Sequence, residues 1–69
     1  MTLRQLRKIN KKTPAEIASV LNVSIRTVFA YEQGTRVINI EQVLILSKEY
    51  RESTEEIIKA QLNSCRKDL

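Results

Sequence analysis

The chain has 69 residues, with 12 lysines and arginines against 8 aspartates and glutamates, and so carries a formal net charge of +4. This length fits one small domain over residues 1–69, the 42% of hydrophobic residues is enough for a core, and a single glycine and a single proline favour helices over hairpins. One cysteine, no histidine and no run of about 18 apolar residues exclude a disulfide framework, a cysteine-rich zinc site and a membrane span. We therefore expect a soluble, cytosolic, helical domain that binds a partner, with no catalytic residue, metal or cofactor.

Two short helices are predicted in the first 21 residues. The first spans about 3–9, and its apolar stripe comprises Leu3, Leu6 and Ile9. The second, at 14–21, has the sharpest local signal, because Thr13 and Glu16 form a capping box and Pro14 occupies the first helical position, where no N–H is needed. Its inner face comprises Ile17, Ala18 and Leu21.

A third helix is predicted at 25–33. Ser24 is its N-cap, and Gly34, the only glycine, lies just past its end, where a glycine is favoured. Val28 and Tyr31 face inward. Because only the three residues 22–24 separate this helix from the one before, the pair forms a compact helix-turn-helix. Such a unit can place the first half of its second helix in a DNA major groove about 12 Å wide.

Two further helices are predicted after residue 38. Asn39 caps the fourth, and its expected inner face comprises Ile40, Val43, Leu44, Ser47 and Tyr50. Ile45 is expected on its outer side, where it could form a dimer patch with Ile58 and Leu62, although core packing is the alternative for those two and the preferred one for Leu62. Ser53 and Glu56 form a second capping box, and the fifth helix is expected to fray near 66–67. Its inner face comprises Ile57, Ile58, Gln61, Leu62 and Cys65, with Cys65 as an inert, buried side chain.

The charge is divided unevenly along the chain. Residues 1–36 hold seven bases and two acids, a net charge of +5, whereas residues 37–69 hold five bases and six acids, a net charge of −1. A basic half beside a near-neutral half is typical of a surface that faces a polyanion. A merely solvated basic face is an equally good explanation of the charge alone.

Several short motifs follow one another in a characteristic order. They are Leu3-Arg4-x-Leu6-Arg7, Thr13-x-x-Glu16-Ile17-Ala18, Leu21-x-Val23-Ser24, Thr27-Val28, Glu32-x-Gly34 and Asn39-Ile40-Glu41-x-Val43-Leu44-x-Leu46-Ser47. Over residues 3–58 the ordered set resembles the lambda-repressor-like helix-turn-helix family of the Cro and XRE type. The resemblance implies an all-α fold of five helices, binding of double-stranded DNA as a homodimer, and transcriptional control. It also implies a partly buried ion pair between Arg7 and Glu32 that ties the first helix to the third.

The outward face of 25–33 is the predicted base-reading surface, made of Ile25, Arg26, Phe29 and Ala30. Arginine to guanine is the commonest specific contact, and this reading of Arg26 is favoured over a solvated arginine. Ile25 and Phe29, four residues apart, could contact thymine methyl groups. An apolar patch for a protein partner ranks second for them, and a rotated helix with Phe29 in the core ranks third.

A second set of polar residues is expected to contact the DNA backbone. Its members are Ser24, Thr27, Gln33, Thr35, Arg36 and Asn39. Ser24 is equally well explained as an N-cap, and both roles can coexist. Lys11, Lys12 and Arg4 add non-specific attraction, with a solvated face as the alternative.

Together these patterns predict a sequence-specific repressor that binds a pseudo-palindromic operator as a dimer. Pro14 departs from the family pattern. The family often has a glutamine there that contacts DNA, and proline has no side-chain donor to replace it. A protein-interaction module of the antitoxin or anti-repressor type, using the Ile25/Phe29 face, is therefore the alternative, as is the DNA-binding head of a longer regulator. Salt dependence separates DNA binding, which weakens steeply with salt, from apolar binding to a protein.

Overall fold

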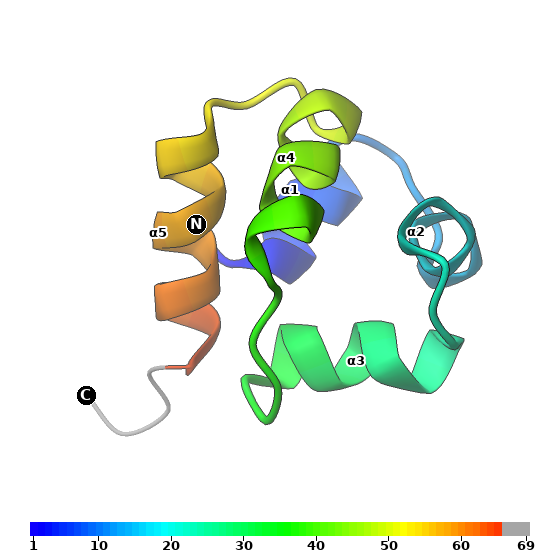
Figure 1. The fold of residues 1–69 in the computed structure, drawn as a ribbon. Helices are drawn as coiled ribbons and strands as arrows, with labels where there is room; N and C mark the ends of the chain where they lie inside the picture. The colour runs from blue at the N-terminus through cyan, green and yellow to red at the C-terminus, as the bar shows by residue number, and fades with distance from the viewer. Residues whose placement is uncertain (66–69) are drawn as a thin grey trace.

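The computed structural model describes residues 1–65. This part of the chain contains five helices and no strand, which confirms the predicted all-α fold. The helices are α1 (Leu3–Ile9), α2 (Pro14–Leu21), α3 (Ile25–Gln33), α4 (Ile40–Glu49) and α5 (Thr54–Cys65). In Figure 1, α3 runs along the lower edge, α4 stands above its C-terminal end, α5 stands to the left of α4, and α1 lies behind α4. The fraying predicted near 66–67 lies outside the described residues.

Local side chains fix most of the helix boundaries. Capping boxes begin α1, α2 and α4; their residue pairs are Thr2 with Gln5, Thr13 with Glu16, and Asn39 with Gln42. Asn22 and Gly34 end α2 and α3 in the left-handed conformation, with φ of 58° and 82°. Because these signals act over three or four residues, the bounds predicted for α2 and α3 are confirmed.

The core is formed by one side of each helix, with α5 at its centre. Ile57 of α5 is fully buried, and Ile17, Val28 and Leu46 each keep only 2% of their surface exposed. The two ends of the described chain meet here, because Leu3 N donates to Ser64 Oγ at 3.1 Å. None of the helices described has the length and apolar character needed to cross a membrane.

The predicted inner face of α4 was right for Val43 and Tyr50 and wrong for Ile40 and Leu44. Ile40 and Leu44 are exposed by 81% and 53%, whereas Gln42 and Leu46 are buried, and Ile45, predicted on the outer side, packs against the core. The reason is Gln42, whose side chain caps α4 and also donates from Nε2 to the Tyr31 hydroxyl at 3.0 Å. Because both functions of its amide are satisfied there, Gln42 can be buried on the core side of α4, beside Val43 and Leu46.

The predicted inner residues of α1 and α5 also need correction. Ile9, Ile58 and Leu62 are exposed by 59%, 49% and 52%, and Cys65 is exposed rather than buried. The predicted Ile57 and Gln61 do lie on the core side of α5, together with Ala60 and Ser64. Two of these side chains are polar, and each is satisfied internally, with Gln61 Oε1 accepting from Ile38 N at 3.0 Å and Ser64 Oγ donating to Ala60 O at 2.9 Å.

The capping box of α2 predicts a measurable pH dependence. Hydrogen bonds from the Thr13 backbone and side chain hold the pKa of Glu16 below its ordinary value. A carboxylate with a lowered folded-state pKa stabilises the fold above its unfolded pKa of about 4.3, and this contribution is lost as the pH falls through the folded value. Glutamine keeps the cap but does not titrate. We therefore expect Glu16→Gln to lose less stability than wild type between about pH 6 and pH 3; equal losses in urea melts at the two pH values would contradict this.

Candidate nucleic-acid interface

The helix-turn-helix is built by α2, a three-residue turn and α3. Asn22 reverses the chain in its left-handed conformation, and Val23 N then donates to Ala18 O at 2.9 Å, which closes the turn against α2. Ala18 is only 5% exposed, so a small side chain lies where the two helices approach. Ser24 Oγ accepts from Thr27 N at 3.1 Å and begins α3. The turn therefore fixes the angle at which α3 leaves α2.

The outer face of α3 carries the predicted base-reading residues. Val28 and Tyr31 anchor the helix from within at 2% and 7% exposure. Ile25 and Phe29 are exposed by 46% and 42%, so the alternative that placed Phe29 in the core is wrong. Arg26 is exposed in the first turn of the helix and Ala30 is half-buried. One face of α3 thus presents two apolar side chains and a cation to solvent.

Polar side chains flank this face at both ends of α3. At the start of α3, the Ser24 and Thr27 hydroxyls share a hydrogen bond of 2.9 Å, and Ser24 Oγ also accepts the capping bond from Thr27 N. Past the end, Thr35 Oγ1 donates to Ala30 O at 3.2 Å. Gln33, Thr35 and Arg36 are all exposed. Asn39 is exposed too, but its Oδ1 already accepts from Gln42 N at 2.8 Å, so its amide nitrogen is the group left for a ligand.

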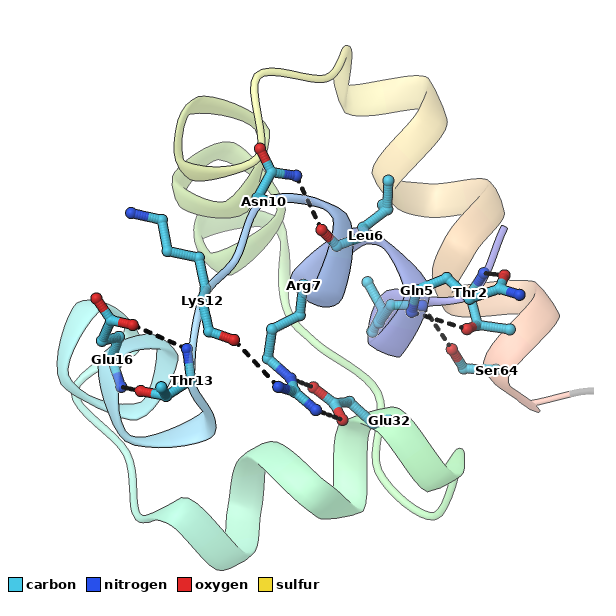
Figure 2. Close-up of polar contacts among 11 residues, drawn as sticks. Thr2, Gln5, Leu6, Arg7, Asn10, Lys12, Thr13, Glu16, Glu32 and Ser64 are labelled. Carbon is cyan, nitrogen blue, oxygen red and sulfur yellow. Dashed lines mark hydrogen bonds and ion pairs between the residues drawn. The ribbon is translucent and has the colours of Figure 1, made fainter.

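A buried ion pair holds α3 against α1 (Figure 2). Arg7 Nε donates to Glu32 Oε2 at 2.6 Å and Arg7 Nη2 to Glu32 Oε1 at 3.2 Å, while Arg7 Nη1 donates to Lys12 O at 3.1 Å. Only 9% and 6% of the two side chains remain exposed. One guanidinium therefore joins α1, the α1–α2 turn and the last turn of α3, which positions the outer face of α3 relative to the rest of the molecule.

The electrostatics of this junction keep Arg7 charged. The hydrogen bond that Arg7 donates to the Glu32 carboxylate raises the pKa of the guanidinium, against a lowering by burial. Nearby, burial raises the pKa of the Tyr50 phenol, so this residue stays neutral. Arg7 therefore remains a charged donor to Glu32 and to Lys12 O, which holds α1 against the end of α3.

Arg4, a basic residue, also lies at the α3 surface, although it belongs neither to the predicted base-reading residues nor to the predicted backbone contacts. Arg4 lines a hollow of about 230 Å³ together with Arg7, Phe29, Glu32 and Gln33. The sequence feature that could have identified Arg4 is its spacing from Arg7, because residues one turn apart lie on the same side of a helix. Lys12, by contrast, pairs with Glu49 at 3.3 Å and lines a separate pocket with Lys48 and Arg51.

The arrangement suits binding to a polyanion. The described residues from 37 to 65 include three bases and five acids, against a net charge of +5 over residues 1–36. The positive charge is therefore concentrated in α1 and the turn that follows it, which hold five of the seven bases, whereas α2 has none and α3 has one base and one acid. Within residues 1–65 no group of three or more potential metal-binding side chains comes together.

Comparison with known proteins places this geometry in a family. No curated protein and no solved structure shows a significant match to the chain. A family model described as helix-turn-helix matches residues 3–57, which includes α1 to α4 and the first turn of α5. Domains of this family are DNA-binding and regulatory rather than enzymatic. The chain belongs to the helix-turn-helix family of the Cro/C1, lambda-repressor-like type.

Proposed function

We propose that the chain is a sequence-specific transcriptional regulator that binds a pseudo-palindromic operator in double-stranded DNA as a homodimer, with α3 in the major groove. The observation that carries the proposal is the outer face of α3. This face is exposed, bears a cation and two apolar side chains, and is held in place by Val28, Tyr31 and the Arg7–Glu32 pair. Repression follows if the operator overlaps the site where polymerase binds.

The base-reading residues divide into one polar and three apolar contacts. Arg26 donates to O6 and N7 of a guanine, the contact that gives arginine its specificity in the major groove. Ile25, Phe29 and Ala30 pack against thymine methyl groups. Apolar groups that remain exposed on a surface helix lose water on contact with a methyl group, so both partners gain from the burial.

The flanking residues hold the helix in register on the phosphates. Ser24 and Thr27 act at the start of α3 and Gln33 at its end. Thr35, Arg36 and the amide of Asn39 contact phosphates from the segment that follows α3. Such contacts fix orientation and carry no sequence information of their own. Arg4 adds charge beside Phe29 and Gln33.

Selection from a random duplex pool at two salt concentrations tests the proposal. We expect an enriched pseudo-palindrome with half-sites about one helical turn, 34 Å, apart. Affinity should fall with salt at a log–log slope of about −0.9 per phosphate contacted. If no motif is enriched at either salt concentration, the chain is not a sequence-specific reader of DNA.

Arg26→Ala separates base reading from charge. If Arg26 binds a guanine, the variant loses about 1–3 kcal/mol on the selected operator and relaxes specificity at one position of each half-site. Arg36→Ala is the matched control, because it removes the same charge from the segment expected to meet phosphate, and it should weaken all sequences alike. A uniform loss for Arg26→Ala, measured by titration on operator and mismatched duplexes, would assign Arg26 to the backbone.

A protein-interaction module is the second candidate, and the exposure of Ile25 and Phe29 favours it. Two large apolar side chains one turn apart, at 46% and 42% exposure, also form an anchor pair for a protein. A complex held by this pair keeps its affinity as salt rises. The salt series of the selection therefore discriminates the two candidates.

A further inference from the structure

A polar pocket of about 410 Å³ lies between the C-terminal ends of α1 and α4. The residues that line it are all polar or charged, and they are Asn10, Lys12, Lys48, Glu49 and Arg51. In Figure 1 this end of α4 lies at the top of the molecule, whereas α3 runs along the lower edge. The pocket, which we name the α1–α4 pocket, is therefore at the opposite end of the fold from α3.

The lining of the α1–α4 pocket carries more positive charge than it neutralises. Three bases face one acid, and this acid is already engaged, because Lys12 Nζ lies 3.3 Å from Glu49 Oε2. Within residues 1–65, neither Lys48 nor Arg51 takes part in an ion pair, and both are exposed. The pocket therefore offers two uncompensated cations beside a neutral pair.

One of these cations occupies a position where the backbone favours glycine. Arg51 follows the end of α4 with a φ of 55°, in the left-handed region. The Ser47 and Lys48 carbonyls accept from backbone N–H groups at 3.0 and 3.4 Å, so the end of the helix does not need the Arg51 side chain as a cap. Past the end of α1, Lys11 repeats the arrangement with a φ of 57°. A positive charge at a strained position beside both helix ends is more than the fold alone requires.

We propose that the α1–α4 pocket binds a small molecule that carries a chain of phosphate groups, as a polyphosphate or a nucleotide does. Its volume of about 410 Å³ lies within the range of small-molecule sites. Arg51 supplies a planar fork that matches two phosphate oxygens, and Lys48 supplies a point charge on a flexible stem. Two free cations match a ligand with at least two negative charges, which a phosphate chain has and a single carboxylate lacks.

The remaining lining of the pocket favours a small ligand over a second nucleic acid. Asn10 Nδ2 donates to Leu6 O at 2.8 Å, which leaves Oδ1 as an acceptor, and Figure 2 shows this oxygen directed away from Leu6. A ligand with a hydroxyl group beside its phosphates can donate to it. A duplex, by contrast, gains affinity from many phosphates along its length, and two free cations would neutralise only two of them.

Lys12 connects the α1–α4 pocket with the residue that positions α3. Its side chain lines the pocket, whereas its carbonyl oxygen accepts from Arg7 Nη1 at 3.1 Å, and Figure 2 shows the two groups pointing in opposite directions. Arg7 in turn pairs with Glu32 of α3. A ligand that attracts Lys12 Nζ away from Glu49 therefore acts on a residue that also holds Arg7, and DNA affinity responds to the anion. Only this last step rests on the proposed function; anion binding itself is measured without DNA.

Calorimetric titration of the full chain with inorganic triphosphate, without DNA, tests the inference. We expect saturable binding that Lys48→Ala and Arg51→Gly each weaken by at least about tenfold, because each removes a charge-assisted contact. Glycine adopts a φ of 55° without strain, so Arg51→Gly should melt within about 4 °C of wild type, which separates lost binding from lost folding. Lys59→Ala is the matched control, since it removes one charge from α5 outside the pocket, and its affinity should stay within about twofold of wild type.

Amide chemical shifts locate the bound ligand. Triphosphate should move the resonances of residues 10–12 and 48–52 and leave those of 25–36 in place. Shifts centred on 25–36 would overturn the inference, as would the lack of saturable binding through about 1 mM. A loss for Lys59→Ala as large as that of the pocket variants would mean diffuse attraction to charge only. Citrate, a tricarboxylate, should bind more weakly than triphosphate, and equal affinity would show that phosphate is not what the pocket recognises.

The link to α3 is measured separately on an operator selected from the random pool. Triphosphate competes with DNA for any basic surface, so the informative quantity is the difference between wild type and Arg51→Gly. We expect a larger change of operator affinity for wild type, and equal changes would refute the coupling through Lys12. Triphosphate binding without an enriched operator keeps the pocket while the DNA-reading function fails; an operator without triphosphate binding gives the reverse.

Discussion

We expect Arg7→Met to destabilise the protein by about 3–5 kcal/mol, the range for removing one partner of a buried ion pair. The substitution leaves the Glu32 carboxylate 6% exposed without its two guanidinium hydrogen bonds, and leaves Lys12 O without the donor at 3.1 Å. Methionine fills most of the space, so the loss reports charge rather than a cavity. Urea denaturation of wild type and variant measures it.

A double replacement separates the charge from the contact. Arg7→Met with Glu32→Leu removes both charges, and buried pairs replaced by apolar residues are often neutral. We expect the double variant to recover most of the lost stability, apart from the hydrogen bond to Lys12 O, which is worth about 1 kcal/mol. If the double variant is as unstable as the sum of the single ones, the pair contributes no coupling, and the account of Arg7 given above is wrong.

Gly34→Ala should cost about 2–4 kcal/mol, for two independent reasons. Gly34 has a φ of 82°, in the left-handed region where an L side chain is strained. A Cβ at this position would also lie 2.4 Å from Ser64 O and 2.8 Å from Cys65 Cα. Both atoms belong to the backbone of α5, so relief requires the last turn of α5 to move away from the end of α3.

Asn22→Ala is the matched control for Gly34→Ala. Asn22 ends α2 with a φ of 58°, and the alanine variant carries the left-handed strain alone, about 1 kcal/mol. The difference between the two variants therefore measures the contact with α5. Hydrogen exchange should show lost protection in the last turn of α5 for Gly34→Ala only. Equal destabilisation by the two substitutions would mean that the α3–α5 contact imposes no constraint.

Sequence reasoning succeeded where structure is local. The bounds of α2 and α3 follow from Thr13, Pro14 and Asn22 for one helix and from Ser24 and Gly34 for the other, because each signal acts within a turn of its own position. The family resemblance succeeded for a related reason, since it depends on the order of these short signals along the chain, and the match over residues 3–57 confirms it.

Sequence reasoning failed where residues far apart in the sequence determine which side chains are buried. Gln42 and Gln61 are buried because their partners are Tyr31 and Ile38, which lie 11 and 23 residues away. Gln61 was predicted inside and is buried, but Gln42 was left out of the predicted inner face of α4. Exposed apolar residues were placed inside in both helices, among them Leu44 of α4 and Leu62 of α5. Ile40 of α4 and Ile58 of α5 were assigned to the inside in the same way, yet they are exposed by 81% and 49%.

The candidate site was located by periodicity and completed only by tertiary structure. The spacing of Val28 and Tyr31 predicts which side of α3 is buried, and hence that Ile25, Arg26 and Phe29 face outward. Nothing within α3 predicts Arg4 as its neighbour, because that proximity depends on how α1 packs against α3. The roles of the outward residues on DNA remain predictions for the titrations described above.

The hydrogen bond between Leu3 N and Ser64 Oγ joins residues 61 positions apart, and this affects how the protein folds during its synthesis. At a synthesis rate of about 5–20 residues per second, α1 is synthesised about 3–12 s before the end of α5. Small helical domains fold in far less time than this once their contacts are available. Until α5 has been synthesised, the apolar side of α1 therefore has no complete core to pack against.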